Sequence, residues 1–502
     1  MATPNQTPHD RAFFGHPRGL STLFFTEMWE RFSYYGMRAL LLLYMTAPLS
    51  AGGLGFDAAQ GGAVYGLYTS MVYMACLPGG WVADRLIGQR KAVLYGGLLI
   101  AAGHFSMAVP ALPAFYLGLF LIVIGTGLLK GNVSVIVGQL YGPEDTRRDA
   151  GFSIFYMGIN LGAFVAPIIC GYLGQNISWH VGFGAAGIGM TLGVIQYVLG
   201  SRQLGDAGLH PAPAASPEAA AADRRTARTW GLVGLALVLV IGLGGYTGLV
   251  PVTPTQVSDA AGVFLLLATV GFFGWLFLSS GWTAAEKKRL YVIGVLFVAS
   301  ALFWSVFEQA GSTLNLFADR NTDTRLFGQS FPSSWFQSLN SLFLIILAPV
   351  FAWFWQWLAR RDQEPTSPAK FVWGLVFVGL GFAVLVGPAA SAESGTLASP
   401  AWLTLTYLLH TIGELALSPV GLSAMTVLAP PRIAGLVMGV WFLATSVGNF
   451  IGGRVSGFYE SMALPTLFGS IAAFAIVAGL ILAALVPVLR RFVPSPTPAA
   501  RS

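Results

Sequence analysis

The sequence predicts an all-α integral membrane protein with fourteen membrane-spanning helices. Hydrophobic residue types make up 55% of the 502 residues and charged types only 10%, and a water-soluble fold could not bury so much apolar surface. Apolar stretches of about 20 residues, the length that a helix needs to cross the hydrocarbon core, recur along most of the chain. A lipid bilayer is therefore the expected solvent.

The apolar stretches also set the order of the elements, in groups of six, two and six. The expected spans are 20–47, 58–83, 91–110, 113–141, 149–174 and 179–200, then 229–250 and 259–280, then 290–316, 331–359, 370–391, 400–428, 432–458 and 464–489. Segment 201–228 is polar and rich in Ala and Pro, without the apolar periodicity of its neighbours. We therefore expect an N-terminal six-helix bundle (1–200), a cytoplasmic linker (201–228), two extra transmembrane helices (229–280) and a C-terminal six-helix bundle with a cytoplasmic tail (281–502).

The distribution of basic residues predicts the orientation in the membrane. If the N-terminus is cytoplasmic, the loops on that side hold 21 of the 27 Lys and Arg residues, and the opposite side holds only Arg320, Arg325 and Arg454. The positive-inside rule then predicts that both termini lie in the cytoplasm. Basic loops that face anionic headgroups also account for the net charge of +6, so a nucleic-acid-binding surface is not expected.

A few ionisable residues remain at membrane depth. They are Glu27, Glu30, Arg31, Arg38, Lys130, Glu308 and Glu414. Each charged side chain at the centre of a membrane helix costs on the order of 2.5–3.5 kcal/mol to insert, so these residues are expected to face one another or water.

Most of these charges lie on one stripe of the first helix. Segment 27–38 reads ExxERxxYYxxR, and offsets of three, four, seven and eleven residues share one helical face. Two carboxylates beside a guanidinium can exchange a salt bridge for a proton, because burial raises a carboxylate pKa and a neighbouring cation lowers it. The stripe therefore predicts a polar cavity with proton-coupling chemistry, although buried pairs can also simply hold helices together.

Segment 27–36, ExxERFxYYG, resembles the helix 1 signature of the proton-coupled oligopeptide transporter (POT) family, within the major facilitator superfamily. Two further stretches resemble the same family, GTGxxK at 125–130 and FYxxINxG at 155–162, and the two extra helices resemble those of its bacterial branch. The resemblance covers nearly the whole chain. It implies the major facilitator fold, two six-helix bundles plus two additional helices, and a symporter that imports di- and tripeptides with protons by alternating access.

The resemblance also implies roles for individual residues in binding the peptide. Arg31 and Lys130 would attract the substrate carboxylate, and Glu414 would hold the amino terminus. The other expected substrate-binding residues are Tyr34, Tyr35, Tyr73, Asn160 and Asn340 around the peptide, and Trp304, Trp441 and Phe442 around its side chains. Each aromatic residue is equally open to interpretation as packed core or as a membrane-interface residue.

The same resemblance implies gating and proton-coupling residues. Arg38 and Glu308 would close the outer side, and Lys130 and Glu414 the inner side. Asp84 and Arg85, in the cytoplasmic loop signature GxxxDRxxGxRK at 80–91, would latch helices in one state. The expected proton-coupling residues are Glu27, Glu30, Arg31 and Glu308.

The sequence departs from the family at two positions. Gly131 stands where many members have a proline after the lysine, and Gly66 stands where animal relatives carry a histidine, so proton coupling would depend on carboxylates. His410 is either a proton shuttle or a packed core residue, and we leave it out of the expected site.

Other functions are less well supported. HExxH, GxSxG and Cys/His pairings are absent, so we expect no enzyme, metal site or cofactor. The charges are dispersed over several helices instead of forming rings, which suits a transporter better than a channel. Transport of another small anion or of a peptide-like drug stays open, as do peptide length and proton stoichiometry. The expected partners are the peptide, protons and lipid, with the chain as a monomer.

Overall fold

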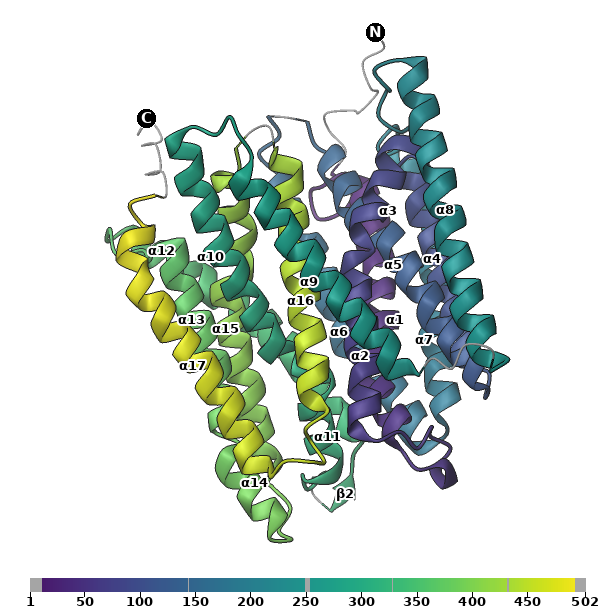
Figure 1. Ribbon diagram of the computed structural model, residues 1–502, viewed down its shortest axis with the longest axis vertical. Helices are drawn as coiled ribbons and strands as arrows, with labels where there is room; N and C mark the ends of the chain where they lie inside the picture. Colours follow the sequence, from purple (N-terminus) through teal and green to yellow (C-terminus); the bar gives the residue numbers. More distant parts are fainter. Residues whose placement is uncertain (1–10, 143, 249–252, 327, 431–432, 493–502) are drawn as a thin grey trace. The chain divides into compact units, whose positions relative to one another are not determined.

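The computed structural model describes residues 11–142, 144–248, 253–326, 328–430 and 433–492. Each of the fourteen expected spans coincides, within these residues, with one helix or with consecutive helices (Figure 1). The spans that form one helix are α1 (Arg18–Thr46), α4 (Gln89–Met107), α5 (Leu112–Gln139), α6 (Arg148–Asn176), α7 (Trp179–Gly200), α8 (Pro217–Tyr246), α9 (Pro254–Leu278), α15 (Pro400–Leu428), α16 (Ala434–Ser456) and α17 (Leu464–Leu489). The expected ends at 249–250 and 432, and the tail after 492, lie outside the described residues.

The other spans are interrupted. They are α2 (Ala58–Met74) followed by α3 (Cys76–Val82) and a π-helical turn (Ala83–Ile87); α10 (Ala284–Phe307), a 3-10 turn (Glu308–Gly311) and α11 (Thr313–Arg320); a 3-10 turn (Ser333–Gln337) and α12 (Ser338–Ala359); and α13 (Ser367–Ala383) followed by α14 (Val386–Glu393). Two short strands, β1 (Arg325–Leu326) and β2 (Gln329–Ser330), precede α12. Breaks of this kind inside a helix often mark functional positions, and one of them falls at Glu308.

Nine helical segments among the described residues are long and apolar enough to cross a membrane by length and composition alone. Helix α1 is not one of them, because its charged residues interrupt the apolar stretch. A prediction from hydropathy alone would therefore miss α1, the helix that carries most of the buried charged residues.

The expected linker 201–228 is partly helical, because α8 begins at Pro217. Ser216 Oγ accepts a hydrogen bond of 3.2 Å from the Ala219 backbone N–H, as an N-cap does. Proline suits the first helical position, and the alanines of 219–222 have the highest helix propensity. Apolar periodicity could not predict the start of α8, because alanines and polar residues form a helix without such periodicity.

The chain forms two compact units. Unit 1 comprises Met1–Gly55, Met71–Val257 and Ser330–Ser341. Within it, α1 packs against α6 and α7, and α4 against α5. A Cβ added at Gly36 of α1 would collide with Cys170 of α6, and one at Gly162 of α6 would collide with the Met28 backbone. Glycine at these positions therefore permits close packing of α1 and α6, as small residues do between membrane helices.

Unit 2 comprises Phe56–Ser70, Ser258–Gln329 and Leu342–Ser502. Helix α13 packs against α15 and α17, and α10 against α16. The first part of α2 contacts α16, where the hydroxyl oxygens of Ser70 and Ser446 are 2.8 Å apart. Unit 2 thus has its own helical core, separate from that of unit 1.

Candidate functional site

The buried charges of α1 pair with one another. Glu27, Glu30 and Arg31 are each at most 4% exposed. Arg31 Nε lies 3.1 Å from Glu27 Oε1 and forms a second ion pair with Glu30 Oε2. The pairing is local, because residues four apart on a helix are neighbours and an acid N-terminal to the base is the favourable order.

The cluster on α1 extends to neighbouring helices of unit 1. Lys130 of α5 lies close enough to Glu27, Glu30 and Arg31 for direct charge interactions. The Lys130 Nζ atom is 3.7 Å from the ring centroid of Tyr73, at the end of α2, which is a cation–π contact. Two carboxylates and two cations therefore meet inside unit 1. We call Glu27, Glu30, Arg31, Lys130 and Tyr73 the charged cluster.

Cys76, at the start of α3, lies within the electrostatic range of the charged cluster. Its Sγ is 3.4 Å from the Val72 carbonyl oxygen. No spacing motif in the sequence signals this position, because the proximity arises from packing of α3 against α5.

The charged cluster keeps hydrogen-bonding capacity that the described residues do not use. Arg31 Nη2 and Glu27 Oε2 are buried and have no hydrogen-bond partner among those residues. Buried polar atoms are nearly always paired in folded proteins. Glu30 Oε1 is unpaired in the same way among the described residues, so the cluster offers one donor and two acceptors to a partner from outside the chain.

The tyrosines and Arg38 continue the stripe along α1. Arg31 Cζ lies 5.5 Å from the centroid of the Tyr34 ring, and Arg38 Cζ lies 5.6 Å from that of Tyr35. The two rings pack edge to face at 5.2 Å. Both guanidinium groups are buried, so each has an aromatic neighbour in place of water.

The two asparagines expected to contact the substrate lie on elements that meet in unit 1. Asn160 of α6 donates a 3.0 Å hydrogen bond from Nδ2 to the Tyr156 carbonyl oxygen. Asn340 is half-buried in the first turn of α12. Ser338 Oγ donates a 2.7 Å hydrogen bond to the Phe164 carbonyl oxygen, which ties the start of α12 to α6.

Unit 2 holds the remaining expected site residues. Trp304 of α10 is buried and packs edge to face against the rings of Phe303 and Phe307, at 5.2 and 5.4 Å between centroids. Glu308 is 6% exposed and is the first residue of the 3-10 turn that follows α10. A Cβ added at Gly448 of α16 would collide with the Trp304 Cβ, so α10 and α16 are in close contact.

The other candidates in unit 2 come from α15 and α16. Trp441 of α16 is buried over Gly421 of α15. Glu414 lies two helical turns before Gly421 and is half-buried, as is Phe442. The candidates of unit 2 thus lie on or directly after α10, α15 and α16, three helices that contact one another. The expected pairs Arg38–Glu308 and Lys130–Glu414 each take one residue from each unit, and both pairs stay predictions.

Asp84 and Arg85 are exposed in the π-helical turn after α3. The Asp84 carboxylate accepts a 2.7 Å hydrogen bond from Gln89 Nε2, and its carbonyl oxygen accepts one of 2.8 Å from the Ala212 backbone N–H. These contacts fasten the turn to the start of α4 and to the segment before α8, and the gating role stays a prediction.

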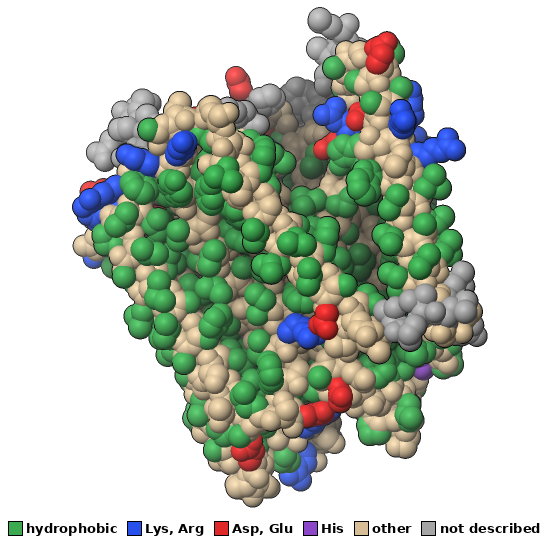
Figure 2. Space-filling model, viewed as in Figure 1, with side chains coloured by type: hydrophobic (Ala, Val, Ile, Leu, Met, Phe, Trp, Pro, Cys, Tyr) green, Lys and Arg blue, Asp and Glu red, His purple; other side chains and the backbone are tan. Residues whose placement is uncertain are grey.

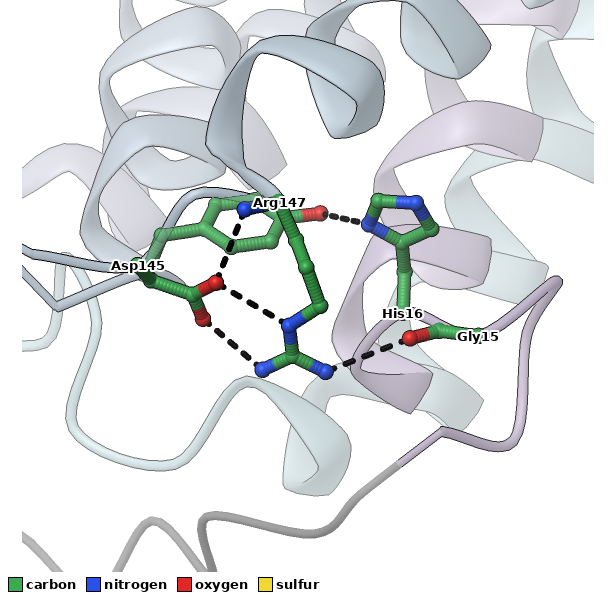
Figure 3. Close-up of polar contacts among 5 residues, drawn as sticks. Gly15, His16, Asp145 and Arg147 are labelled. Carbon is green, nitrogen blue, oxygen red and sulfur yellow. Dashed lines mark hydrogen bonds and ion pairs between the residues drawn. The ribbon is translucent and has the colours of Figure 1, made fainter. Parts of the chain in front are cut away.

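A second polar group in unit 1 was not expected from the sequence (Figure 3). Arg147 donates to the Asp145 carboxylate through Nε at 3.0 Å and Nη2 at 2.7 Å, and through Nη1 to the Gly15 carbonyl oxygen at 3.2 Å. The His16 Nδ1 atom lies 3.0 Å from the Tyr141 hydroxyl. We call Gly15, His16, Tyr141, Asp145 and Arg147 the N-terminal clip, because it fastens the segment before α1 to the segment between α5 and α6.

The N-terminal clip changes two pKa values. Hydrogen bonds from Arg147 lower the pKa of Asp145 to about 2. Burial lowers the pKa of His16, and the nearby Arg147 charge adds to this shift. Both groups are therefore held in one protonation state at neutral pH, Asp145 as a carboxylate and His16 as a neutral imidazole.

Histidine and metal chemistry have little geometric support. His410 is buried between the rings of Phe307 and Phe382, at 6.1 and 5.4 Å, against Gly381. This environment fits a packed core residue. Among the described residues, no group of three His, Cys, Asp or Glu side chains is arranged to hold a metal ion.

Comparisons of the sequence find close relatives. A model described as the POT family matches residues 90–221 and 265–472. The chain is 44% identical to the uncharacterized transporter YclF of Bacillus subtilis, with 96% of each chain covered. It is 42% identical to the peptide transporter YePEPT of Yersinia enterocolitica, with 98% of each covered. It is 36% identical to a di-/tripeptide transporter of Lactococcus lactis, over 96% of this chain and 97% of the relative.

Solved structures match equally well. A peptide transporter POT in complex with sulfate is 44% identical, with a TM-score of 0.90 over 97% of this chain and 98% of that chain. A POT family transporter in complex with 5-aminolevulinic acid is 36% identical, with a TM-score of 0.87 over 96% and 98%. The expected fold class, an all-α membrane protein of the major facilitator type, is therefore confirmed.

Proposed function

Since the chain belongs to the POT family, and is thus a membrane transporter and not an enzyme, we propose that it imports di- and tripeptides in symport with protons by alternating access. Two of its relatives are named for peptide or di-/tripeptide transport. The proposal needs no cofactor, because the proton gradient supplies the driving force.

The charged cluster carries this proposal. Its two carboxylates and Arg31 are buried, and Lys130 is half-buried beside them. Breaking a buried ion pair costs several kcal/mol unless a new partner replaces the old one. A peptide carboxylate is such a partner for Arg31 and Lys130, and a proton is such a partner for Glu27 and Glu30. Substrate and proton binding therefore become linked through shared partners.

The unused donor on Arg31 sharpens the assignment. Arg31 Nη2 is buried without a partner among the described residues, while Nε is occupied by the acids of α1. A buried guanidinium nitrogen without a partner can donate a charge-assisted hydrogen bond to a carboxylate. We assign Arg31 and Lys130 to the peptide carboxylate and Glu414 to the peptide amine. The other expected substrate-binding residues would then surround the rest of the peptide. They are Tyr34, Tyr35, Tyr73, Asn160, Trp304, Asn340, Trp441 and Phe442.

The proposed transport cycle uses two switches. Arg38 with Glu308 would close one side of the pathway, and Lys130 with Glu414 the other, so that only one pair is intact at a time. Protonation of an acid, or arrival of a substrate charge, would release the pair. Glu27, Glu30, Arg31 and Glu308 would carry the coupling, and Asp84 and Arg85 would stabilise one state from the cytoplasmic side.

We further propose that the chain acts as a monomer in a bacterial inner membrane with both termini cytoplasmic. The positive-inside distribution of Lys and Arg supports this orientation, and the three relatives described above come from bacteria.

A second candidate substrate class is a small anion or a peptide-like drug. Solved relatives were crystallised with sulfate and with 5-aminolevulinic acid. The two cations of the charged cluster would attract any small anion, so charge alone does not select a peptide.

Uptake by purified protein in liposomes tests the proposal. With an acidic outside, labelled di-alanine should enter in a saturable manner and accumulate above its outside concentration. Unlabelled dipeptides and tripeptides should compete, and 5-aminolevulinic acid serves as the probe for the alternative. Accumulation of 5-aminolevulinic acid without any accumulation of di-alanine would favour the second candidate, and no acid-dependent uptake of either would refute both.

A further inference from the structure

Unit 2 contains an apolar groove that the transport proposal does not use. The groove measures about 1160 Å³ and is formed mainly by α9, α10 and α17. Ligand pockets in proteins generally measure ~300–1,000 Å³, so this space is large enough for a lipid-sized molecule. Its wall includes Phe273, Phe277, Tyr291, Phe297, Phe474 and Leu485.

Aromatic pairs stiffen the wall of the groove. The rings of Phe273 and Phe297 are 4.8 Å apart between centroids, and those of Phe277 and Tyr291 are stacked at 5.4 Å. Both pairs join α9 to α10. Planar rings packed in this way present a smooth apolar surface with little conformational freedom, which suits a hydrocarbon chain lying along it.

The groove is elongated along the helices. The lining residues of α17 run from Ser470 to Leu485 on one face, which at 1.5 Å per residue spans about 22 Å. One leaflet of hydrocarbon is about half of the ~30 Å bilayer core. A fatty acyl chain that entered from one leaflet would therefore fit lengthwise.

One end of the groove is basic. Lys287 and Lys288 lie one helical turn before Tyr291 in α10, and Arg490 lies just after α17, about one turn beyond Leu485. The Lys288 Nζ atom lies 5.5 Å from the centroid of the Phe492 ring, so the start of α10 and the end of α17 meet. In Figure 2, blue side chains border the hydrophobic surface at the upper left, where Figure 1 draws these two ends.

These cations are available to a ligand. Within the described residues, no carboxylate forms an ion pair with Lys287, Lys288 or Arg490. The nearby acid, Glu286, is used by the helix cap, where its Oε2 accepts from the Thr283 backbone N–H at 2.8 Å. Three cations beside one carboxylate leave this end of the groove with net positive charge.

We propose that this groove binds one anionic glycerophospholipid. An acyl chain would lie against the aromatic wall, and the phosphate would contact Lys287, Lys288 and Arg490. The chemistry is that of basic pockets between membrane helices, which take acidic headgroups. The zwitterionic headgroup of phosphatidylcholine carries no net charge, so charge complementarity selects the anionic class.

Native mass spectrometry of the delipidated full-length chain tests the proposal. Dioleoyl phosphatidylglycerol and dioleoyl phosphatidylcholine, which share their acyl chains, are added separately. We expect one phosphatidylglycerol molecule to bind at about tenfold lower concentration than phosphatidylcholine, since each cation near a headgroup contributes to attraction. Equal binding of the two lipids by the unaltered chain would overturn the proposal, and this comparison needs no variant.

Two sets of variants locate the site. The triple variant Lys287→Gln/Lys288→Gln/Arg490→Gln should lose the preference for phosphatidylglycerol, whereas Arg224→Gln/Arg225→Gln/Arg228→Gln, which removes three charges from α8, should keep it. Ala473→Trp fills the groove and should weaken binding of both lipids, whereas Leu480→Trp, on an exposed part of α17 outside the lining, should not. A preference that survives the triple variant, or is lost equally in the α8 control, would place the lipid elsewhere.

Discussion

In the described part of unit 1, two arginines pair with carboxylates in opposite surroundings. Arg31 with Glu27 and Glu30 is at most 4% exposed, whereas the Arg147 and Asp145 side chains are 30% and 20% exposed. Water can replace a lost partner at the second pair but not at the first. The comparison teaches that surroundings, and not the pair itself, make a charge pair useful for coupling, because only a buried carboxylate requires a proton or a ligand once its partner leaves.

Neutralising Glu30 tests most directly whether the buried ion pairs couple peptide transport to protons. Glu30→Gln keeps the shape of the side chain but removes one of the two charges facing Arg31. We expect acid-driven uptake of di-alanine to fall at least about tenfold, the equivalent of ~1.4 kcal/mol, while exchange between labelled and unlabelled di-alanine across the membrane persists. Uptake that still follows the proton gradient at the original rate would remove Glu30 from the coupling mechanism.

Removing the substrate-facing charges should have the next largest effect. Lys130→Ala and Glu414→Ala should each weaken peptide binding by about 2–5 kcal/mol, the range for losing one partner of a buried charge pair. Asp84→Ala, which removes an exposed carboxylate, is the matched control and should change affinity little. Calorimetry or tryptophan fluorescence with di-alanine measures the three affinities, and similar losses in all of them would contradict the site assignment.

The cation–π contact between Lys130 and Tyr73 predicts a smaller effect. Tyr73→Leu removes the ring under the ammonium group and should weaken peptide binding by about 0.5–2 kcal/mol. Tyr73→Phe keeps the ring and should stay close to the unaltered chain. If Tyr73→Phe binds the peptide as weakly as Tyr73→Leu, the Tyr73 hydroxyl and not its ring face supports peptide binding.

The exposed pair of the N-terminal clip predicts the smallest effect. Asp145→Asn should lower the free energy of unfolding at pH 7 by about 0.5–1 kcal/mol, as for partly exposed pairs, with no effect on proton coupling. The pKa of Asp145 in the folded chain, about 2, lies below its ordinary value near 4. Its stabilisation is therefore complete above about pH 4 and is lost as the pH falls through about 2.

Thermal unfolding in detergent at pH 7 and at pH 2 measures this difference. The variant and the unaltered chain should differ at pH 7 and converge at pH 2. A difference that persists at pH 2 would mean that the Arg147–Asp145 charge pair is not its origin.

The features that the sequence predicted correctly involve residues that are close together in the chain. Each of the fourteen spans follows from the local composition of the chain, and the pairs of α1 follow from the offsets of three and four residues that place Glu30 and Arg31 on the same face as Glu27. The start of α8 was missed because its first turns are alanines and polar residues, which carry no hydrophobic period. Local patterns thus predicted the helices and the ion pairs of α1 but not every helix boundary.

Contacts between distant parts of the chain were beyond sequence reasoning. The N-terminal clip joins residues 125 and 132 positions apart, and no spacing rule relates such residues. Cys76 lies beside the charged cluster only because α3 packs on α5. The resemblance to a family supplied the roles of Lys130 and Glu414, which lie on separate helices and share no motif with α1.

Proton flux on addition of peptide tests the central claim most directly, namely that a peptide carboxylate and protons share the charged cluster. A pH-sensitive dye inside liposomes reports protons while di-alanine is added outside without an imposed gradient. We predict acidification of the interior that follows di-alanine entry, and no acidification with Glu30→Gln although di-alanine still equilibrates. Entry of di-alanine into liposomes with the unaltered chain, without any change in internal pH, would contradict the account.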